Sequence, residues 1–266
     1  MSKILVIAAG FLAVLFGVWY AFSNRETIQD GGSVPAPAPS TTQDNTYLPS
    51  TLGQGRVVFM VKDAVTGSMQ EVSAVLITVD KVEVQSATQG WITVSTAQKQ
   101  YDLLKLKQSG SAALLADVNL PADIYNQIRL NIRTVEVRTS NTMQEAKLPS
   151  HTLKIIGNIT VGAGKTSTVT IDFLADKSLH LTGNGTFIMA PVVKFESRTG
   201  ANAEVKADES VAVSGGRVDT ERESGMDEKG EMRANFELKG NLDIDASNVI
   251  RIKSGTEVQN MINLKY

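Results

Sequence analysis

From Arg56 onward, apolar and polar residues alternate along much of the chain. Apolar side chains recur at every second position in several short runs, and this period places them on one face of a β-strand. The runs are 57–61, 75–79, 82–84, 128–132, 135–137, 153–161, 168–173 and 187–195. The pattern therefore predicts a series of half-buried strands.

Turn-forming residues separate these predicted strands. They are Gly90, Pro121, Pro149 and the runs 162–164 and 183–185. Glycine and proline are typical of turns because of their backbone geometry. A helical pattern occurs only at 103–116, and the interruption at 109–111 limits it to two short turns. Since the connections are too short for helical crossovers, we expect an all-β fold, an antiparallel sandwich of two sheets.

The segment 119–130 has the features of a strand start. Pro121 precedes the strand, and Tyr125 comes early in it. A tyrosine in this position can pack its ring inward and pair its hydroxyl at the sheet edge. The segment resembles the LPxGxYxxIxL start of a strand in transthyretin-like and other immunoglobulin-like sandwich modules. The resemblance implies a sandwich of that type.

Seven segments, in one order, resemble the prokaryotic DUF4382 family. They are 55–64, 72–87, 90–95, 101–106, 114–132, 148–155 and 161–196. The family is a domain of unknown function in bacterial and archaeal surface or membrane-anchored proteins. The resemblance therefore implies a location at the cell surface or membrane and a β-sandwich fold, but it implies no catalysed reaction. This chain has Ala122-Asp123 where the family commonly has Ala-Gly, which argues against a tight glycine turn there.

The N-terminal segment has the composition of a membrane span. Residues Ile4 to Phe22 contain no charge, and nineteen residues at about 1.5 Å each match a bilayer's hydrocarbon thickness. Lys3 precedes the segment, and Trp19 and Tyr20 stand at its far end, so we expect the rest of the chain outside the cytoplasm. A cleaved signal peptide, with Ala21-Phe22-Ser23 at the cleavage site, is the alternative, and the protein would then be secreted.

The remaining boundaries follow from changes in composition. Residues 24–54 are rich in Gly, Ser, Thr and Pro, and Pro35, Pro37 and Pro39 favour an extended linker. The predicted domains are an anchor at 1–23, this linker at 24–54, a sandwich at 55–198 and an acidic, β-rich extension at 199–266. Within the extension, 202–233 is expected to be a flexible connection or a loose hairpin, and strand alternation resumes at 236–252.

Composition narrows the possible chemistry. With 26 Lys+Arg against 28 Asp+Glu, the net charge is -2, so nothing suggests a nucleic-acid partner. The absence of cysteine excludes disulfides and thiolate metal sites. The two histidines, His151 and His180, leave few candidates for a catalytic base.

The sharpest candidate site is a pair of carboxylates near a predicted strand end. Asp172 and Asp176 could converge on a Ca²⁺ ion together with backbone carbonyls, although the spacing of a regular calcium loop is absent. In the alternative interpretation, Asp172 faces solvent and Asp176 caps the following turn. His180 is then expected to be a partly buried residue with satisfied hydrogen bonds. No other cofactor is expected.

Other candidate motifs fit turns or packing better than chemistry. Residues 162–166 lack the first glycine of a phosphate-binding loop and precede a strand. Ser150 and His151 are adjacent, which does not bring the hydroxyl and the ring within reach. Trp91, the main candidate for sugar stacking, is assigned to core or edge packing.

These observations favour a surface protein that has no catalytic activity. We expect a membrane-anchored, extracytoplasmic β-sandwich with a structural or adhesive role at the cell surface. The alternative is a ligand-binding module for a glycan or a Ca²⁺-bridged surface, using the loops from Asp172 to His180. Expected partners are the membrane, through the N-terminal helix, and a glycan or an envelope protein.

Overall fold

The computed structural model describes residues 53–63, 72–140, 142–240, 242–247 and 249–252. The predicted anchor and most of the predicted linker lie outside these ranges. No helix within them is long and apolar enough to cross a membrane.

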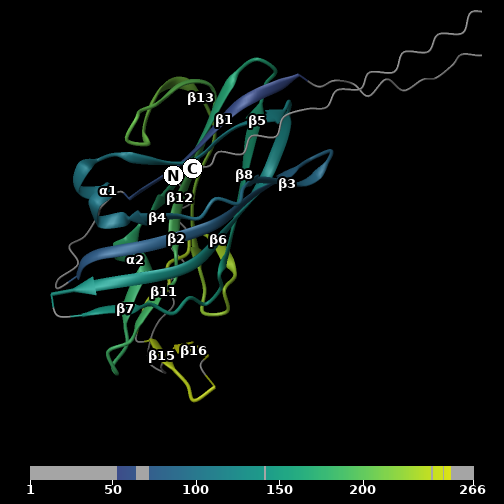
Figure 1. Ribbon diagram of the computed structural model, residues 1–266. Coiled ribbons are helices and arrows are strands. Elements are labelled where there is room, and N and C mark those ends of the chain that lie inside the picture. Colours follow the sequence, from purple (N-terminus) through teal and green to yellow (C-terminus); the bar gives the residue numbers. More distant parts are fainter. Residues whose placement is uncertain (1–52, 64–71, 141, 241, 248, 253–266) are drawn as a thin grey trace, which may run out of the picture. The chain divides into compact units, whose positions relative to one another are not determined.

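Most of the described residues belong to two six-stranded sheets (Figure 1), here named sheet A and sheet B. Sheet A contains β1 (Gln54–Asp63), β5 (Ala112–Pro121), β9 (Thr166–Phe173), β12 (Val192–Val205), β13 (Ser210–Met226) and β14 (Met232–Ala234), in the order β12-β9-β1-β5-β13-β14. Strand β13 also pairs with β12, so five strands of this sheet close on themselves.

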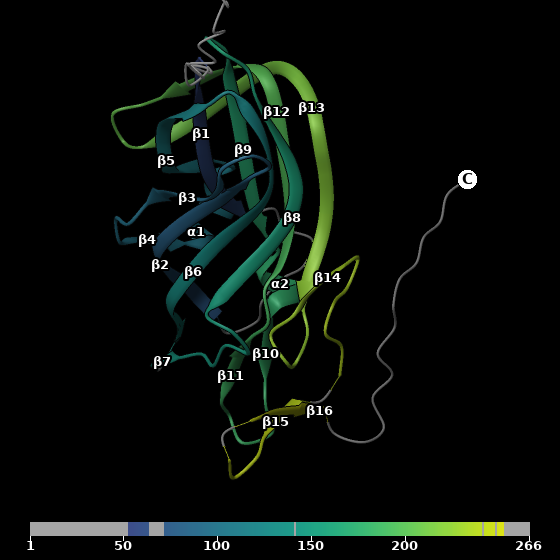
Figure 2. The same ribbon diagram turned by 90° about the vertical axis from the view of Figure 1, so that its right-hand side faces the viewer.

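Sheet B is built around the long pair β2–β6. Its strands are β2 (Val72–Ser86), β3 (Gly90–Ser95), β4 (Lys99–Asp102), β6 (Asp123–Thr139), β7 (Met143–Glu145) and β8 (Thr152–Val161). Strands β3 and β4 pair with one side of β2, and β7 and β8 pair with the far side of β6. In Figure 1, β2 and β6 lie in front of β12, and the turned view of Figure 2 shows them on opposite sides.

The remaining elements are short. They are α1 (Leu103–Ser109), α2 (Ala175–Ser178), the pair β10 (Leu179–Leu181) and β11 (Phe187–Met189), and the pair β15 (Leu242–Ile244) and β16 (Ile250–Ile252). The carboxylate of Asp102 caps the start of α1, and Gly110, with φ 62°, ends it. The helical pattern at 103–116 therefore produces a helix only before the interruption; the second expected turn is wrong, because residues 112–116 belong to β5.

One hydrophobic core lies between the two sheets. Alternate residues of sheet A, such as Phe59 and Ile171, meet alternate residues of sheet B, such as Ile77 and Leu130, and all four are fully buried.

The prediction of an all-β fold is confirmed. The expectation of purely antiparallel pairing is wrong for β1 and β9, which are parallel. About a hundred residues separate these strands, so no hairpin imposes an antiparallel direction.

Tyr125 and Asp123 stabilise the start of β6. The Tyr125 ring is fully buried, as expected from the sequence, and its paired hydroxyl has the Pro121 carbonyl as its acceptor at 2.9 Å. The carboxylate of Asp123 accepts hydrogen bonds from Ser86 and Thr88 in the β2–β3 turn. Neither Ala122 nor Asp123 has a positive φ. The aspartate therefore replaces a glycine turn with a side-chain link to the neighbouring turn.

The outer edge of β8 is closed by side chains from sheet A. Asn158 and Thr160 donate their backbone N–H groups to Thr220 and Asp219, and Ser197 Oγ donates to the Asn158 carbonyl. A Cβ at Gly157 would lie 2.4 Å from the Phe195 ring, so only glycine allows this approach. These contacts satisfy part of an edge that could otherwise pair with another chain.

The sheet continues beyond the predicted domain end at residue 198. Strand β12 crosses that position, and β13 returns alongside it, so the hairpin alternative describes this segment and the flexible connection does not. Farther along, Phe236, Leu238, Leu242 and Ile250 bury their side chains against Ile188 in a second, small core.

Substitutions at neighbouring positions of β6 test the assigned faces. Leu130 is fully buried, so Leu130→Ala should lower the free energy of unfolding by roughly 2–5 kcal/mol. Asn131 lies on the outer face and donates to Asp80 at 2.6 Å, so Asn131→Ala should cost at most about 1 kcal/mol. Urea unfolding of both variants gives the comparison. Equal losses would mean that both faces of β6 are buried.

A buried carboxyl group at the end of β1 makes stability depend on pH. Asp63 accepts from the Ala175 N–H at 3.2 Å, and burial, with a smaller contribution from the charge of Asp172, raises its pKa to about 7. The unfolded carboxyl ionises near its ordinary value of 3.8. Because the folded pKa is the higher one, the stabilisation from this group is complete below pH 4 and is lost as the pH rises through 7.

Asp63→Asn should remove this pH dependence while keeping an oxygen for Ala175. The wild type should lose about 2 kcal/mol more unfolding free energy than the variant between pH 5 and pH 8. Chemical unfolding at the two pH values measures the difference. Parallel pH profiles for the two proteins would contradict the assignment.

Candidate functional site

Asp172 lies on the side of β9 that faces away from the main core. It is 4% exposed, and its carboxylate lies 3.4 Å from the Lys62 ammonium group. The interpretation that Asp172 faces solvent is therefore wrong. Side chains alternate between the two faces of β9, so Ile171 and Phe173 enter the main core and Asp172 points to the opposite face. That face is covered by the tip of the β12–β13 hairpin, and Asp172 is therefore buried.

Asp176 lies in the first turn of α2 and not at its cap, which is Leu174. Its charge and that of Asp172 both contribute to the raised pKa of Asp63, so the three carboxyl groups interact. Within the described residues, no group of three or more His, Asp or Glu side chains could hold a metal ion. The calcium site at Asp172 and Asp176 stays a prediction.

A cavity of about 310 Å³ lies beside Asp172. Met60 and Val211 line one part of it, and Lys62, Lys194 and Asp172 line another. The charged groups already pair within the protein: Lys62 with Asp172, and Lys194 with Glu221. A ligand would have to displace these ion pairs, so the cavity is a weak candidate.

His180, on β10, differs from its expected state. Burial lowers its pKa to about 4, so the ring is neutral at pH 7. The Nε2 atom is buried and has no hydrogen-bond partner among the described residues. The expectation of a satisfied histidine is therefore wrong for this nitrogen.

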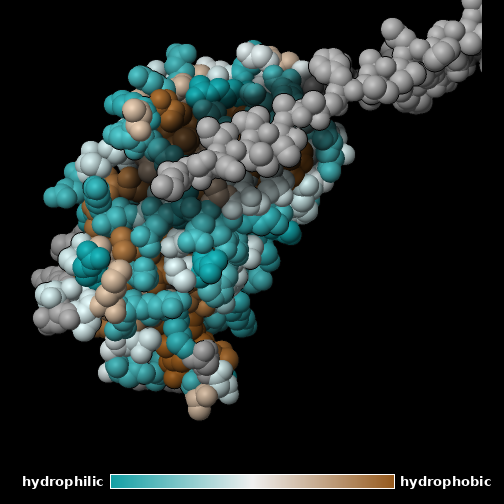
Figure 3. All heavy atoms as spheres, in the orientation of Figure 1, coloured by the Kyte–Doolittle hydropathy of each residue, from teal (hydrophilic) through white to brown (hydrophobic). Residues whose placement is uncertain are grey.

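The outer face of sheet B carries an ordered array of polar side chains. Outward residues of β3, β2, β6 and β8 are paired directly across neighbouring strands, and each such set forms a row across the sheet. The rows are Trp91, Gln85, Gln127 and Ile156; then Thr93, Glu83, Arg129 and Lys154; then Lys81, Asn131 and Thr152. In Figure 3, which has the orientation of Figure 1, the surface over these strands is mainly hydrophilic. We call this array the sheet B face.

A hollow of about 460 Å³ lies on the sheet B face. It is lined by charged and hydrogen-bonding side chains alone: Lys81, Glu83, Arg129, Asn131, Ser150, Thr152 and Lys154. Its volume is within the range of about 300–1,000 Å³ for small-molecule sites, although such sites are usually more apolar. The hollow therefore suits a strongly hydrated ligand.

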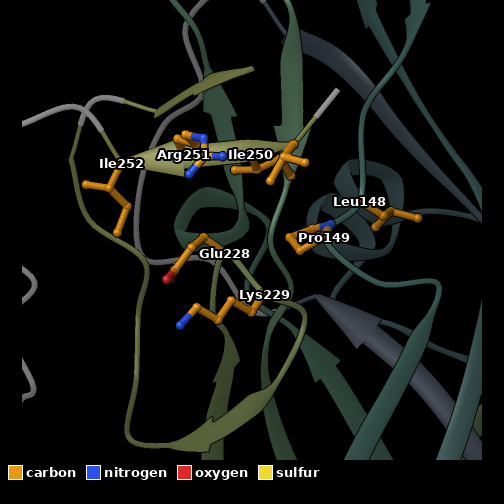
Figure 4. A pocket seen from close by; sticks show the side chains of 8 residues that line it. Leu148, Pro149, Glu228, Lys229, Ile250, Arg251 and Ile252 are labelled. Atoms are coloured by element: carbon orange, nitrogen blue, oxygen red, sulfur yellow. The ribbon is translucent and has the colours of Figure 1, made fainter. Parts of the chain in front are cut away.

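A second hollow, of about 560 Å³, lies near the C-terminal strands. Its side chains come from the loop at 148–149, the turn at 228–229 and β16 (Figure 4). The charged group from β16, Arg251, is paired with Asp245 at 2.6 Å. The lining side chains do not gather around a common point in Figure 4, so this hollow offers less for recognition than the sheet B face.

The pattern of the sequence alone does not reveal the sheet B face. Trp91 is half-buried at the sheet edge, consistent with its assignment to edge packing, but the guanidinium group of Arg129 stacks on its ring. The signal in the sequence is the polar set that alternates with the apolar residues on three strands. Which members meet depends on strand register.

Comparison with known families gives one result. A family model described as a domain of unknown function, DUF4382, matches residues 54–191. No curated protein and no solved structure shows significant similarity to the chain. Because the matched residues make up more than half of the 266-residue sequence, the chain belongs to the DUF4382 family.

Proposed function

We propose that this protein is anchored in a membrane and presents its β-sandwich outside the cytoplasm, where it has an adhesive role at the cell surface and no catalytic activity. The uncharged segment Ile4 to Phe22, with Lys3 before it, supports the location. The proline-containing linker that follows supports a domain held away from the bilayer. Cleavage at Ala21 to Ser23 would release the same domain.

The packing of Tyr125 supports a sandwich of immunoglobulin-like or transthyretin-like type. In immunoglobulin-like domains, a tyrosine hydroxyl commonly bonds to a backbone group a few residues upstream. Tyr125 makes this contact with Pro121. Folds of this kind serve many binding proteins, so the type agrees with an adhesive role without establishing it.

The arrangement of hydroxyl and imidazole groups supports a role other than catalysis. Ser150 Oγ donates to the Thr152 carbonyl, and His151 Nδ1 lies 2.8 Å from the Ile132 carbonyl. Each side chain of this adjacent pair is thus bonded elsewhere. A nucleophile activated by a base needs a direct hydrogen bond between the two.

The sheet B face is the observation that carries the adhesive proposal. Gln85, Gln127 and Asn131 each present a side-chain amide, a group that both donates and accepts hydrogen bonds. A sugar hydroxyl also does both, so the amides and hydroxyls spread over the three rows of this face match a polysaccharide chain. We therefore assign a glycan as the ligand of this face. Glycan binding is the alternative function expected from the sequence, but there it is placed on the loops from Asp172 to His180.

The location is tested by protease treatment of intact cells that express the full chain. Cleavage within residues 24–52 should release a fragment that contains the sandwich, because the linker is expected outside the membrane. Lysed cells show whether the sites are cleavable at all. A fragment that is protected in intact cells and cut after lysis would place the domain in the cytoplasm and overturn the proposal.

The binding face is tested with the double variant Gln85→Ala/Gln127→Ala of the full chain in detergent. Its retention on an insoluble polysaccharide panel should fall at least tenfold, because the central amides of one row are removed. Asn202→Ala, an exposed change on the β12–β13 hairpin of the other sheet, is the matched control. Both should melt within a few degrees of the wild type. Equal retention of all three proteins would contradict the assignment.

A further inference from the structure

Arg129 is held in an unusual way at the edge of the hollow on the sheet B face. Its side chain extends across β2 from β6, and its Cζ atom lies 3.7 Å from the centre of the Trp91 ring on β3. A guanidinium group over an indole ring is attracted by the ring electrons, and the stack fixes the plane of the group. The donors of Arg129 are therefore oriented before any ligand arrives.

These donors are not used within the described part of the protein. The Nε atom is buried and has no hydrogen-bond partner there, and the two terminal nitrogens form no hydrogen bond or ion pair with the described residues. An arginine presents five N–H groups in a rigid fork that matches the two oxygens of a carboxylate. The terminal nitrogens, which are not buried without a partner as Nε is, are the donors that a ligand in the hollow could reach.

The surrounding charges favour an anion at this point. Lys154 is the cross-strand neighbour of Arg129 on β8, and its only described ion pair, with Glu231, spans 3.9 Å. Glu83 is the one acid that lines the hollow, and it pairs with Lys81 at 2.8 Å. Lys81 and Glu83 thus cancel, which leaves Arg129 and Lys154 as the two positive charges in the lining of the hollow that Glu83 does not neutralise.

We propose that this hollow binds the carboxylate group of an acidic polysaccharide built from uronic acid residues, with Arg129 as the bidentate donor. Lys154 provides a second positive charge. The Thr152 hydroxyl and the Asn131 amide oxygen, whose amide nitrogen already donates to Asp80, hydrogen-bond to ring hydroxyls in the same hollow. Trp91 is a positioning residue that holds the guanidinium plane. This assignment rests on the proposed glycan-binding role and names the class of glycan.

The experiment compares three probes on the full chain in detergent by calorimetric titration. Polygalacturonate should bind, and its fully methyl-esterified form, which has the same backbone without charge, should bind at least tenfold more weakly. Inorganic phosphate should not displace polygalacturonate at equal charge concentration. Displacement by phosphate would overturn the assignment to a carboxylate.

Variants then locate the binding site. Arg129→Gln should reduce affinity for polygalacturonate at least tenfold, and Arg129→Lys should also reduce it, because lysine keeps the charge but not the fork. The matched control is Arg138→Gln, an exposed arginine on the same strand with the same change in charge, and it should alter affinity less than twofold. Melting midpoints check folding, and Lys154→Gln, with an expected loss of several-fold, is a second probe of the hollow.

The outcomes separate this inference from the general proposal. Equal binding of charged and esterified polymer, with Gln85→Ala/Gln127→Ala still deleterious, would overturn the acidic ligand and leave the glycan-binding face intact. No binding of any polysaccharide would overturn both. Equal effects of Arg129→Gln and Arg138→Gln would mean that the polymer is bound by non-specific charge attraction, and would contradict the assignment of the binding site to the hollow.

Discussion

The pairing of β2 with β6 is the constraint on which the rest of the structure depends. Both strands are long, and the register between them decides which side chains enter the core. The register shifts near Val79 and Lys81 allow Val79 and Val82 both to face inward, although they are three residues apart. A slip by one residue would exchange the two faces of the strands. The core and the sheet B face are therefore set by the same register.

A sandwich needs only one apolar face on each sheet, and this protein uses the other faces differently. On sheet A, the tip of the β12–β13 hairpin folds over the outward side chains and makes a small third cluster around Val58 and Met60. The buried carboxylate of Asp172 and the partly exposed ammonium group of Lys62 lie at the margin of that cluster and neutralise each other. On sheet B, none of the described residues forms such a cover over the hollow.

This asymmetry explains why the recognition chemistry is assigned to sheet B. Charged groups beside the β12–β13 hairpin already have partners in the protein, and a ligand would gain little by replacing them. Among the described residues, Arg129 has only a stacking partner, so the hydrogen-bonding capacity of its terminal nitrogens is not used there. The stack with Trp91 also reduces the conformational entropy that binding would otherwise cost.

The sequence by itself determined most of the long strands, their inward residues and the family, but not β5 or β13. Alternation is local, so positions such as Ile77, Leu130 and Ile171 can be assigned to a core without knowing their neighbours. The interaction of Tyr125 with Pro121, four residues upstream, is local in the same sense. Only the tertiary structure decided the parallel pairing of β1 with β9, the burial of Asp172 and the stack of Arg129 on Trp91. Each of these joins residues that are far apart in the chain, and their meeting depends on strand order and register, which a periodic pattern does not encode.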